Sequence, residues 1–535
     1  TETESGITNT LYQIQEGTEY LNQNDTYNYV NSNYYYEFVG QYDRLFSEKH
    51  QVGGLLVFNF SESMNTISGS SALANLPSRN MGLSGRATYG YDDRYFGELN
   101  FGYNGSEKFA ENNRFGFFPS AGLGWIVSNE SFFDDFKNTI SLLKLKFTYG
   151  LVGNDNIAPA SDRFFYLSDV NLNEGGRSYT WGDDYSNYFN GYNIYRYSNP
   201  NVTWEVAEKT NYGLEIEFFE NLLLQVDYFT EHRKKIYESR PVFPQTAGLT
   251  TSISSNTGEV SSHGIDIALD YNNAFPSGLY VTGRGTFTYA TNEILVKNEP
   301  QYPYSYLSEI GYHTNQPRGY IADRLFIDEA DIINSPEQFN GLSGGEYTYL
   351  PGDIKYVDVN EDGKINELDR MPIGKPYVPE IVFGFGASIG YKNIDISFFF
   401  QGAGNTSFFV DPNAVAPFIN ERNALSVITN NNWSENNPDP YAFWPRLSTE
   451  IVENNNHNST WWLRDGDFIR LKNIELGYTL PKELIGDNDL KTRFYLSGLN
   501  LFNYSSFDLW DIEMAGNGLG YPPQRILNAG VQLNF

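Results

Sequence analysis

Segments in which apolar and polar side chains alternate recur along the chain up to its last residue. In one such segment, 142–151, the apolar positions are Leu143, Leu145, Phe147, Tyr149 and Leu151. The positions between them are Lys144, Lys146, Thr148 and Gly150. Because successive side chains of a β-strand leave opposite faces, each segment would have one apolar and one polar side. The connections between segments are alternately very short and very long, which is typical of bacterial outer-membrane β-barrels.

The alternation predicts an all-β, antiparallel transmembrane barrel of about fifteen strands. We expect them at 34–45, 51–62, 81–91, 95–104, 121–128, 141–152, 209–219, 222–232, 262–272, 278–291, 382–391, 394–402, 468–479, 493–502 and 526–535. Tight turns are expected at 92–94, 220–221, 273–277 and 392–393. The whole of 1–535 is then barrel wall with long extracellular loops, which are expected at 153–208, 233–261, 292–381 and 403–467.

An odd number of strands is unexpected, because single-chain bacterial outer-membrane barrels have even numbers. Either one more strand lies in the Tyr- and Asn-rich stretch 8–31, or the chain is the C-terminal part of a larger barrel. In the second case the missing strands must be supplied, since each unpaired backbone group in lipid costs several kcal/mol. No signal peptide begins at Thr1, so we expect Thr1 to be a mature terminus or an internal point of a longer chain.

Composition supports a membrane barrel and excludes several other classes. The 41 Tyr and 39 Phe residues suit a protein with aromatic rings at two membrane–water interfaces. The net charge of −30 makes nucleic acid a poor partner, because a nucleic-acid-binding surface has to neutralise phosphates. There is no cysteine, which excludes disulfides and zinc–thiolate sites within these residues.

Eight short motifs, taken in this order and spacing, resemble the C-terminal two-thirds of SusC/RagA-type TonB-dependent transporters. They are YDDRY at 91–95, FFPS at 117–120, GWIVSNE at 124–130, YGLVGN at 149–154, NPNVTWE at 199–205, PGDIKY at 351–356, FIRLKNI at 468–474 and LGY at 476–478. Together they extend along nearly the whole chain. Each motif alone is weak, whereas the ordered set is specific.

The resemblance implies a 22-stranded barrel whose lumen holds an N-terminal plug, so that this chain would be its last fifteen strands. It further implies a Gram-negative outer-membrane location and coupling to TonB through the plug portion. A SusD-like surface lipoprotein would cover the barrel. The implied function is import of oligosaccharides or, in some members, of peptides.

The segment 358–369 has the spacing of a calcium-binding loop, with oxygen ligands at positions 1, 3, 5, 7, 9 and 12 and glycine at position 6. The corresponding residues are Asp358, Asn360, Asp362, Lys364 through its carbonyl, Asn366 through water, Asp369, and Gly363 as the glycine. We expect a structural calcium ion that orders a long loop. The alternative is a metal-free turn, because Asp, Asn and Gly are also common in turns for conformational reasons.

Aromatic residues in the expected long loops are candidates for contacts with substrate or with the lid protein: Trp181, Tyr192, Tyr195, Trp433, Trp444, Trp461 and Trp462. Such rings could stack on sugars. Packing within the loops, or in the interfacial girdle, is an equally good interpretation for each of them.

No residue pattern indicates catalysis, and we expect that the protein is not an enzyme. Gly341-Leu342-Ser343-Gly344-Gly345 matches the G-x-S-x-G motif of esterases, but that motif requires a strand before it and a helix after it. The remaining alternatives are a passive porin, which would need no plug, and a surface adhesin or glycan-binding β-protein. Rows of outward Leu, Phe and Tyr disfavour the adhesin, because a soluble protein rarely exposes such surfaces.

Overall fold

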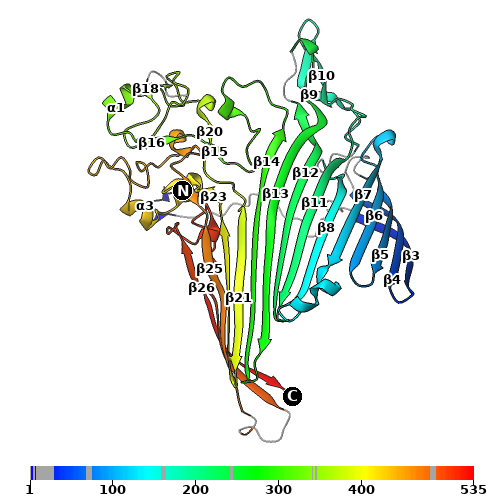
Figure 1. The fold of residues 1–535 in the computed structure, drawn as a ribbon. Coiled ribbons are helices and arrows are strands. Elements are labelled where there is room, and N and C mark those ends of the chain that lie inside the picture. Colours follow the sequence, from blue (N-terminus) through cyan, green and yellow to red (C-terminus); the bar gives the residue numbers. More distant parts are fainter. Residues whose placement is uncertain are drawn as a thin grey trace.

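The computed structural model describes residues 2–3, 6–7, 29–67, 75–157, 164–240, 245–339, 342–343, 346–481, 483 and 490–535. Within these ranges, fifteen strands form one continuous antiparallel sheet, which appears in Figure 1 as a curved wall of long strands. In chain order they are β3 (Tyr29–Phe46), β4 (His50–Ile67), β5 (Ser78–Tyr91), β6 (Tyr95–Ser106), β7 (Phe115–Ile126), β8 (Ile140–Asn154), β11 (Glu205–Phe218), β12 (Leu222–Arg240), β13 (Ile253–Ala274), β14 (Leu279–Val296), β21 (Ile381–Tyr391), β22 (Ile394–Gly404), β25 (Phe468–Thr479), β26 (Lys491–Ser505) and β27 (Ile526–Asn534).

The predicted all-β fold and the set of fifteen strands are confirmed, and each predicted segment corresponds to one strand of this sheet. Each strand pairs with the strands before and after it in this series, so that β3 and β27 form the two edges. Most boundary differences lie at the end of the sheet with the long connections. There the ladder of backbone hydrogen bonds continues into polar sequence, which carries no alternating pattern.

The expected long connection 233–261 is mostly strand. β12 continues to Arg240 and β13 already begins at Ile253, with Arg240 paired to Ile253. Beyond the lipid-facing part of the sheet, a hairpin needs only backbone pairing and no apolar face. Its residues therefore show no alternation of apolar and polar side chains. The additional strand considered in 8–31 falls largely outside the described residues.

The sheet has an apolar and a polar face, as the alternation predicts. On the apolar face Leu99 and Leu123, which lie on neighbouring strands, are each 65% exposed. The cross-strand register places Thr88, Glu98, Gly122 and Thr148 in one row on the opposite, polar face. Exposed leucines in rows are suited to contact with lipid.

The short connections are tight turns in the left-handed region of backbone conformation. Asp92 and Asp93 have φ values of 53° and 50°, and Phe219 and Glu220 have values of 53° and 60°. Positive φ at both central residues defines the type I′ turn, whose twist matches that of a two-stranded antiparallel hairpin. The turns expected at 92–94 and 220–221 are therefore confirmed.

Smaller two-stranded sheets lie in the connections and at the N-terminus. They pair β1 (Glu2–Thr3) with β2 (Gly6–Ile7), β9 (Asp169–Trp181) with β10 (Asn187–Arg196), β15 (Arg318–Gly319) with β20 (Met371–Pro372), β16 (Ala322–Leu325) with β19 (Ile354–Tyr356), β17 (Leu342–Ser343) with β18 (Glu346–Tyr347), and β23 (Ser407–Phe409) with β24 (Leu463–Asp465). The hairpin β9–β10 extends beyond the rim of the sheet at the top of Figure 1.

The described helices are short and lie mostly in the connections. The α-helices are α1 (Glu329–Ile333), α2 (Pro412–Val415) and α3 (Ser426–Asn430). The 3₁₀ helices are η1 (Glu111–Asn113), η2 (Val127–Asn129), η3 (Ser131–Phe136), η4 (Gln245–Ala247), η5 (Ser305–Leu307), η6 (Glu367–Asp369), η7 (Ile419–Glu421), η8 (Glu453–Asn456) and η9 (Ile512–Met514). No helix in the described part of the chain has the length and apolar character needed to cross a membrane.

Three long connections fold together at one end of the sheet into what we call the loop body, namely the described residues of 305–380, 405–467 and 506–525. Figure 1 shows its elements β15, β16, β20, β23, α1 and α3 gathered at the upper left. Its hydrophobic core consists of Tyr320, Leu325, Ile354, Tyr356, Ile365, Val410, Val415, Ile428, Trp433, Ala442, Trp444, Trp462, Phe507 and Ile512. The third connection, 506–525, was not among the long loops predicted from sequence.

Candidate functional site in the loop body and the outer hairpin

The loop body is held together by backbone contacts between its three connections. The Leu325 amide donates to the Pro440 carbonyl at 2.8 Å, and the Arg446 amide donates to the Gly352 carbonyl at 2.9 Å. The Asp411 amide donates to the carbonyl of Gly516 at 3.0 Å, which adds the third connection. These contacts join segments more than 90 residues apart, so the loop body is one folded unit over the end of the sheet.

The PGDIKY motif at 351–356 lies at the centre of this unit. Asp353 is fully buried, and its Oδ1 lies 2.8 Å from Arg446 Nε and 2.8 Å from Asn455 Nδ2. Burial raises the pKa of Asp353, and the positive charge of Arg446 offsets only part of this rise. Gly352 has a φ of 87° and packs against the Trp433 ring, where an added Cβ would collide with it. The motif thus connects two loops.

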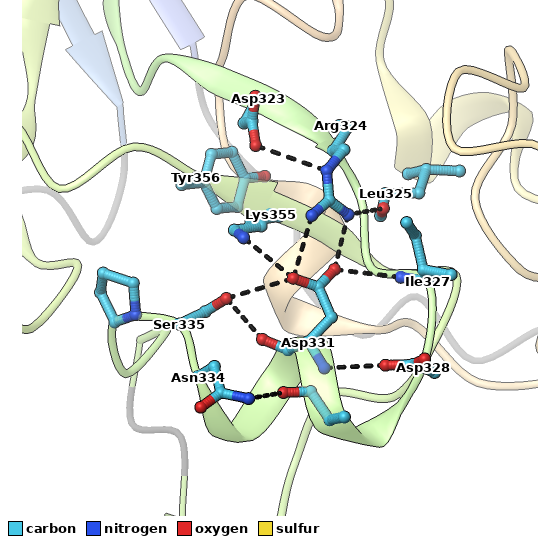
Figure 2. A network of polar contacts seen from close by, with 12 residues as sticks. Asp323, Arg324, Leu325, Ile327, Asp328, Asp331, Asn334, Ser335, Lys355 and Tyr356 are labelled. Carbon is cyan, nitrogen blue, oxygen red and sulfur yellow. Dashed lines mark hydrogen bonds and ion pairs between the residues drawn. The ribbon is translucent and has the colours of Figure 1, made fainter.

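A second polar network, drawn in Figure 2, fixes the short helix α1 against β16 and β19. Asp331 receives hydrogen bonds from Arg324 Nη1 at 2.5 Å and Nη2 at 3.0 Å, and from Lys355 Nζ at 3.0 Å. Burial opposes ionisation of Asp331, but the hydrogen bonds from Arg324 and Lys355 lower its pKa overall. Asp328 caps the helix by accepting from the Asp331 amide at 2.8 Å.

Three of the seven predicted contact aromatics belong to the core of the loop body. Trp433, Trp444 and Trp462 are 7%, 6% and 1% exposed, and the rings of Trp444 and Trp462 have centroids 5.1 Å apart. In this arrangement they have no free face for a sugar ring. Their burial favours the alternative interpretation, packing within the loops. Trp461 is partly buried at the edge of the same core and donates from Nε1 to the Phe443 carbonyl at 3.2 Å.

The other three aromatics lie on the hairpin β9–β10 and are exposed. The exposed fractions of Trp181, Tyr192 and Tyr195 are 62%, 63% and 52%. The Tyr195 hydroxyl donates to Glu174, and this bond together with one from the Gly176 amide lowers the pKa of Glu174. These three rings are the predicted contact residues that are accessible to a ligand or partner, and they remain predictions.

The predicted calcium loop, 358–369, forms a closed turn on the loop body. Asp358 accepts from the amides of Asp362 at 3.2 Å and Gly363 at 2.7 Å, and Asp362 accepts from the Lys364 amide at 2.9 Å. Asp369 is fully buried and accepts from the amide of Asn366 at 2.8 Å. Gly363 has a φ of 86°, as expected for position 6.

The oxygen donors of this loop are of the type that calcium prefers. Burial raises the pKa of Asp369, and the nearby negative charge of Asp358 adds to this effect. Among the described residues, no three His, Cys, Asp or Glu side chains converge closely enough to hold a metal ion. The side-chain oxygens are instead bonded to the backbone of their own loop.

Two polar clusters account for the YDDRY and GWIVSNE motifs and for the lysines of β8. Glu130 accepts from Arg94 Nη1 at 2.9 Å and from Trp125 Nε1 at 3.2 Å, which connects the YDDRY and GWIVSNE motifs at the short-turn end. On the polar face, Lys144 and Lys146 lie 3.5 and 2.7 Å from Glu215. Both clusters bring together residues from separate elements of the chain, so their pairing was not evident from sequence.

Ser343 lies in β17, a two-residue strand paired with β18. This is a small hairpin and not the strand–turn–helix that the esterase motif requires. The structural setting therefore gives no support to the enzymatic alternative.

Comparison with known proteins agrees with this fold. No family model matches the chain. TonB-dependent receptor P3 of Formosa agariphila is 27% identical over 494 residues, covering 84% of this chain and 45% of that protein. TonB-dependent receptor SusC of Bacteroides thetaiotaomicron is 23% identical over 470 residues, covering 84% of this chain and 43% of that protein.

Among solved structures, a chain of the RagAB peptide importer in its closed-closed state matches with a TM-score of 0.68 at 21% identity. The match covers 95% of this chain and 56% of that chain. Our chain thus spans about half the length of the relatives that it matches. The predicted resemblance is confirmed: the chain is similar, along most of its length, to SusC/RagA-type TonB-dependent transporters.

Proposed function

We propose that this chain is the C-terminal barrel portion of a TonB-dependent importer in the Gram-negative outer membrane. The observation that carries the proposal is the fifteen-stranded antiparallel sheet, with an apolar face on one side and a folded loop body at one end. Similarity to proteins named as TonB-dependent receptors supports it. The remaining strands and a plug, through which TonB acts, would be supplied by an N-terminal portion outside these residues.

The cargo in this proposal is an oligosaccharide or a peptide, captured beneath a SusD-like lipoprotein at the extracellular side. The loop body would then be extracellular, and the exposed hairpin residues Trp181, Tyr192 and Tyr195 would meet the cargo or the lipoprotein. Transport requires no bond to be made or broken in the cargo, so the protein is proposed not to be an enzyme.

The test is growth of the native bacterium with the complete gene deleted, on defined oligosaccharides and on peptides as the only nutrient. We expect the deletion, and separately the loss of TonB function, to abolish growth on one of these classes. The class that is lost identifies the cargo. Uptake that persists without TonB would instead indicate a passive porin, and surface binding without uptake would indicate an adhesin.

We further propose that the loop 358–369 binds one calcium ion, which stabilises the loop body. The support is the register of the oxygen donors, the positive φ of Gly363 and the burial of Asp369. Calcium would supply positive charge to Asp358, Asp362 and Asp369, and would offset the entropy lost when this loop is ordered.

Terbium luminescence of the purified complete protein tests this calcium site. We expect terbium to bind, calcium to displace it, and Asp358→Asn to weaken binding at least tenfold. The matched control is Glu361→Gln, because Glu361 lies in the same loop at a non-ligand position and is exposed. Equal affinities in the two variants, or no terbium signal in the unmodified protein, would refute the calcium site.

A further inference from the structure

A broad hollow lies in the wall of the sheet over strands β3 to β8 and reaches Lys209 of β11. Its volume is about 990 Å³. The residues that line it on the polar face come from successive cross-strand rows, among them Thr88, Glu98, Asn100, Gly122 and Thr148. The volume is at the upper end of the range for small-molecule sites, enough for several sugar rings or amino-acid residues.

Two glycines of β7, Gly122 and Gly124, line the hollow at positions where a side chain would fit without crowding. A Cβ built at Gly122 would have its nearest neighbour, Thr148 Cγ2, at 3.5 Å, and one built at Gly124 would have Phe96 Cβ at 3.5 Å. These are ordinary contacts, so side chains would fit at both positions. The absence of side chains there is therefore not required by crowding.

Two glycines on the polar face of β21 are covered by aromatic rings. On β21, a Cβ at Gly390 would meet the ring of Tyr280, and one at Gly384 would meet the ring of Phe399. Aromatic rings thus fill the space over those glycines, whereas at Gly122 and Gly124 of β7 a Cβ would make only ordinary contacts at 3.5 Å or more. The hollow is a local feature of β7 and its neighbours, not a general property of glycine in this sheet.

The two lysines that line the hollow are paired with carboxylates. Lys146 lies 2.7 Å from Glu215, and Lys209 lies 3.0 Å from Glu231. Glu98 accepts a hydrogen bond from Asn100 Nδ2 at 2.7 Å. A surface of hydroxyls, amides and paired charges offers many weak contacts and no high-affinity binding site. Passage requires such contacts, since a molecule that binds too tightly does not leave.

We propose that this hollow, centred on Gly122 and Gly124, is the part of the barrel wall along which the polar cargo passes. The inference rests on the proposed importer function and assigns its route. The cargo would slide over the bare backbone of β7, with Thr88 and Thr148 offering hydroxyls on the two sides.

Cysteine accessibility tests the route without knowledge of the cargo, because these 535 residues have no cysteine of their own. Gly122→Cys would be introduced into the complete protein in its native outer membrane and exposed to membrane-impermeant fluorescein maleimide. Labelling would be compared with and without a protonophore, which removes the energy supply for TonB. Gly124→Cys provides a second variant should the first fail to assemble.

The matched control is Gly54→Cys, on strand β4 and on the apolar face, where Gly54 pairs with Ala87 and does not line the hollow. A Cβ at Gly54 has no neighbour within 4 Å, so this variant is as easy to accommodate. We expect several-fold stronger labelling of Gly122→Cys in energised cells than with the protonophore, and no labelling of Gly54→Cys in either state.

Two outcomes would overturn the route. Gly122→Cys and Gly124→Cys that assemble but stay unlabelled in energised cells would show that the hollow is permanently covered. Labelling that does not respond to the protonophore would show a permanently open surface. TonB-dependent growth of the unmodified strain, measured in parallel, separates failure of the route from failure of the importer function.

Discussion

Replacing Trp462 by alanine should unfold the loop body locally and leave the sheet intact. Trp462 is 1% exposed, packs against Trp444 with ring centroids 5.1 Å apart, and donates from Nε1 to the Asn455 carbonyl at 2.8 Å. A buried tryptophan removes up to about 250 Å² from water, worth about 6 kcal/mol at about 25 cal/mol per Å². Alanine keeps part of that contact, and measured losses for buried aromatics are about 3–5 kcal/mol.

We therefore expect a loss of about 4 kcal/mol in the opening free energy of the loop body. Hydrogen–deuterium exchange with mass spectrometry measures it, since each 1.4 kcal/mol corresponds to about tenfold faster exchange through local opening. Amides of β19 and β24 should exchange about 10³-fold faster, while those of β11 to β13 should not change. Trp462→Phe keeps a ring but leaves the Asn455 carbonyl unpaired, so its effect should be about 1–3 kcal/mol.

The control is Trp181→Ala, because Trp181 is 62% exposed on the hairpin β9–β10 and has little packing to lose. Its exchange should equal that of the unmodified protein. Exchange in the loop body of Trp462→Ala within threefold of the unmodified rate would refute the argument that this core holds the three connections together. Equal acceleration in the strands of the sheet would refute the independence of the loop body.

Three further predictions concern lipid contact, pH and the network of Figure 2. Leu123→Arg, on the apolar face, should destabilise the folded protein in lipid by about 2–4 kcal/mol, whereas Thr148→Arg, on the polar face, should destabilise it much less. Urea titrations of the complete protein in vesicles measure both effects. Burial lowers the pKa of His457 in the folded protein, so below pH about 6.5 the unfolded state takes up the proton first and the loop body loses stability. Hydrogen exchange, corrected for the intrinsic exchange rates, should show this loss of stability between pH 7 and 5. The variant His457→Phe should reduce the pH dependence. Asp331→Asn should cost about 2 kcal/mol in the exchange of α1 amides, whereas Asp323→Asn, 3.7 Å from Arg324 and exposed, should have no effect.

The polar face and the core of the loop body differ in how far they could be predicted. Each strand of the sheet carries its own signal, because a period of two is a local property of residues such as those in 142–151. The core around Trp433, Trp444 and Trp462 has no such signal. Its members come from loops with no common period, and their burial depends on contacts between segments more than 90 residues apart.

The candidate site divides in the same way. The calcium loop and the exposed rings Trp181, Tyr192 and Tyr195 were named from sequence, since ligand spacing and aromatic content are local properties. The buried Asp353 was part of a recognised motif, but its pairing with Arg446 and Asn455 required the folded loops. The hollow at Gly122 and Gly124 depends on what neighbouring strands place above them, and glycines in β21 with the same local sequence character are covered by rings.

The sequence by itself determined the fold class, the fifteen strands, the two faces of the sheet and the family resemblance. Side-chain alternation and turn residues act within a few positions along the chain, so both patterns can be recognised in the sequence. Only the tertiary structure decided that three connections form one loop body, which aromatics are buried in it, and where the wall is hollow. Those outcomes depend on packing between distant segments, which local composition does not encode.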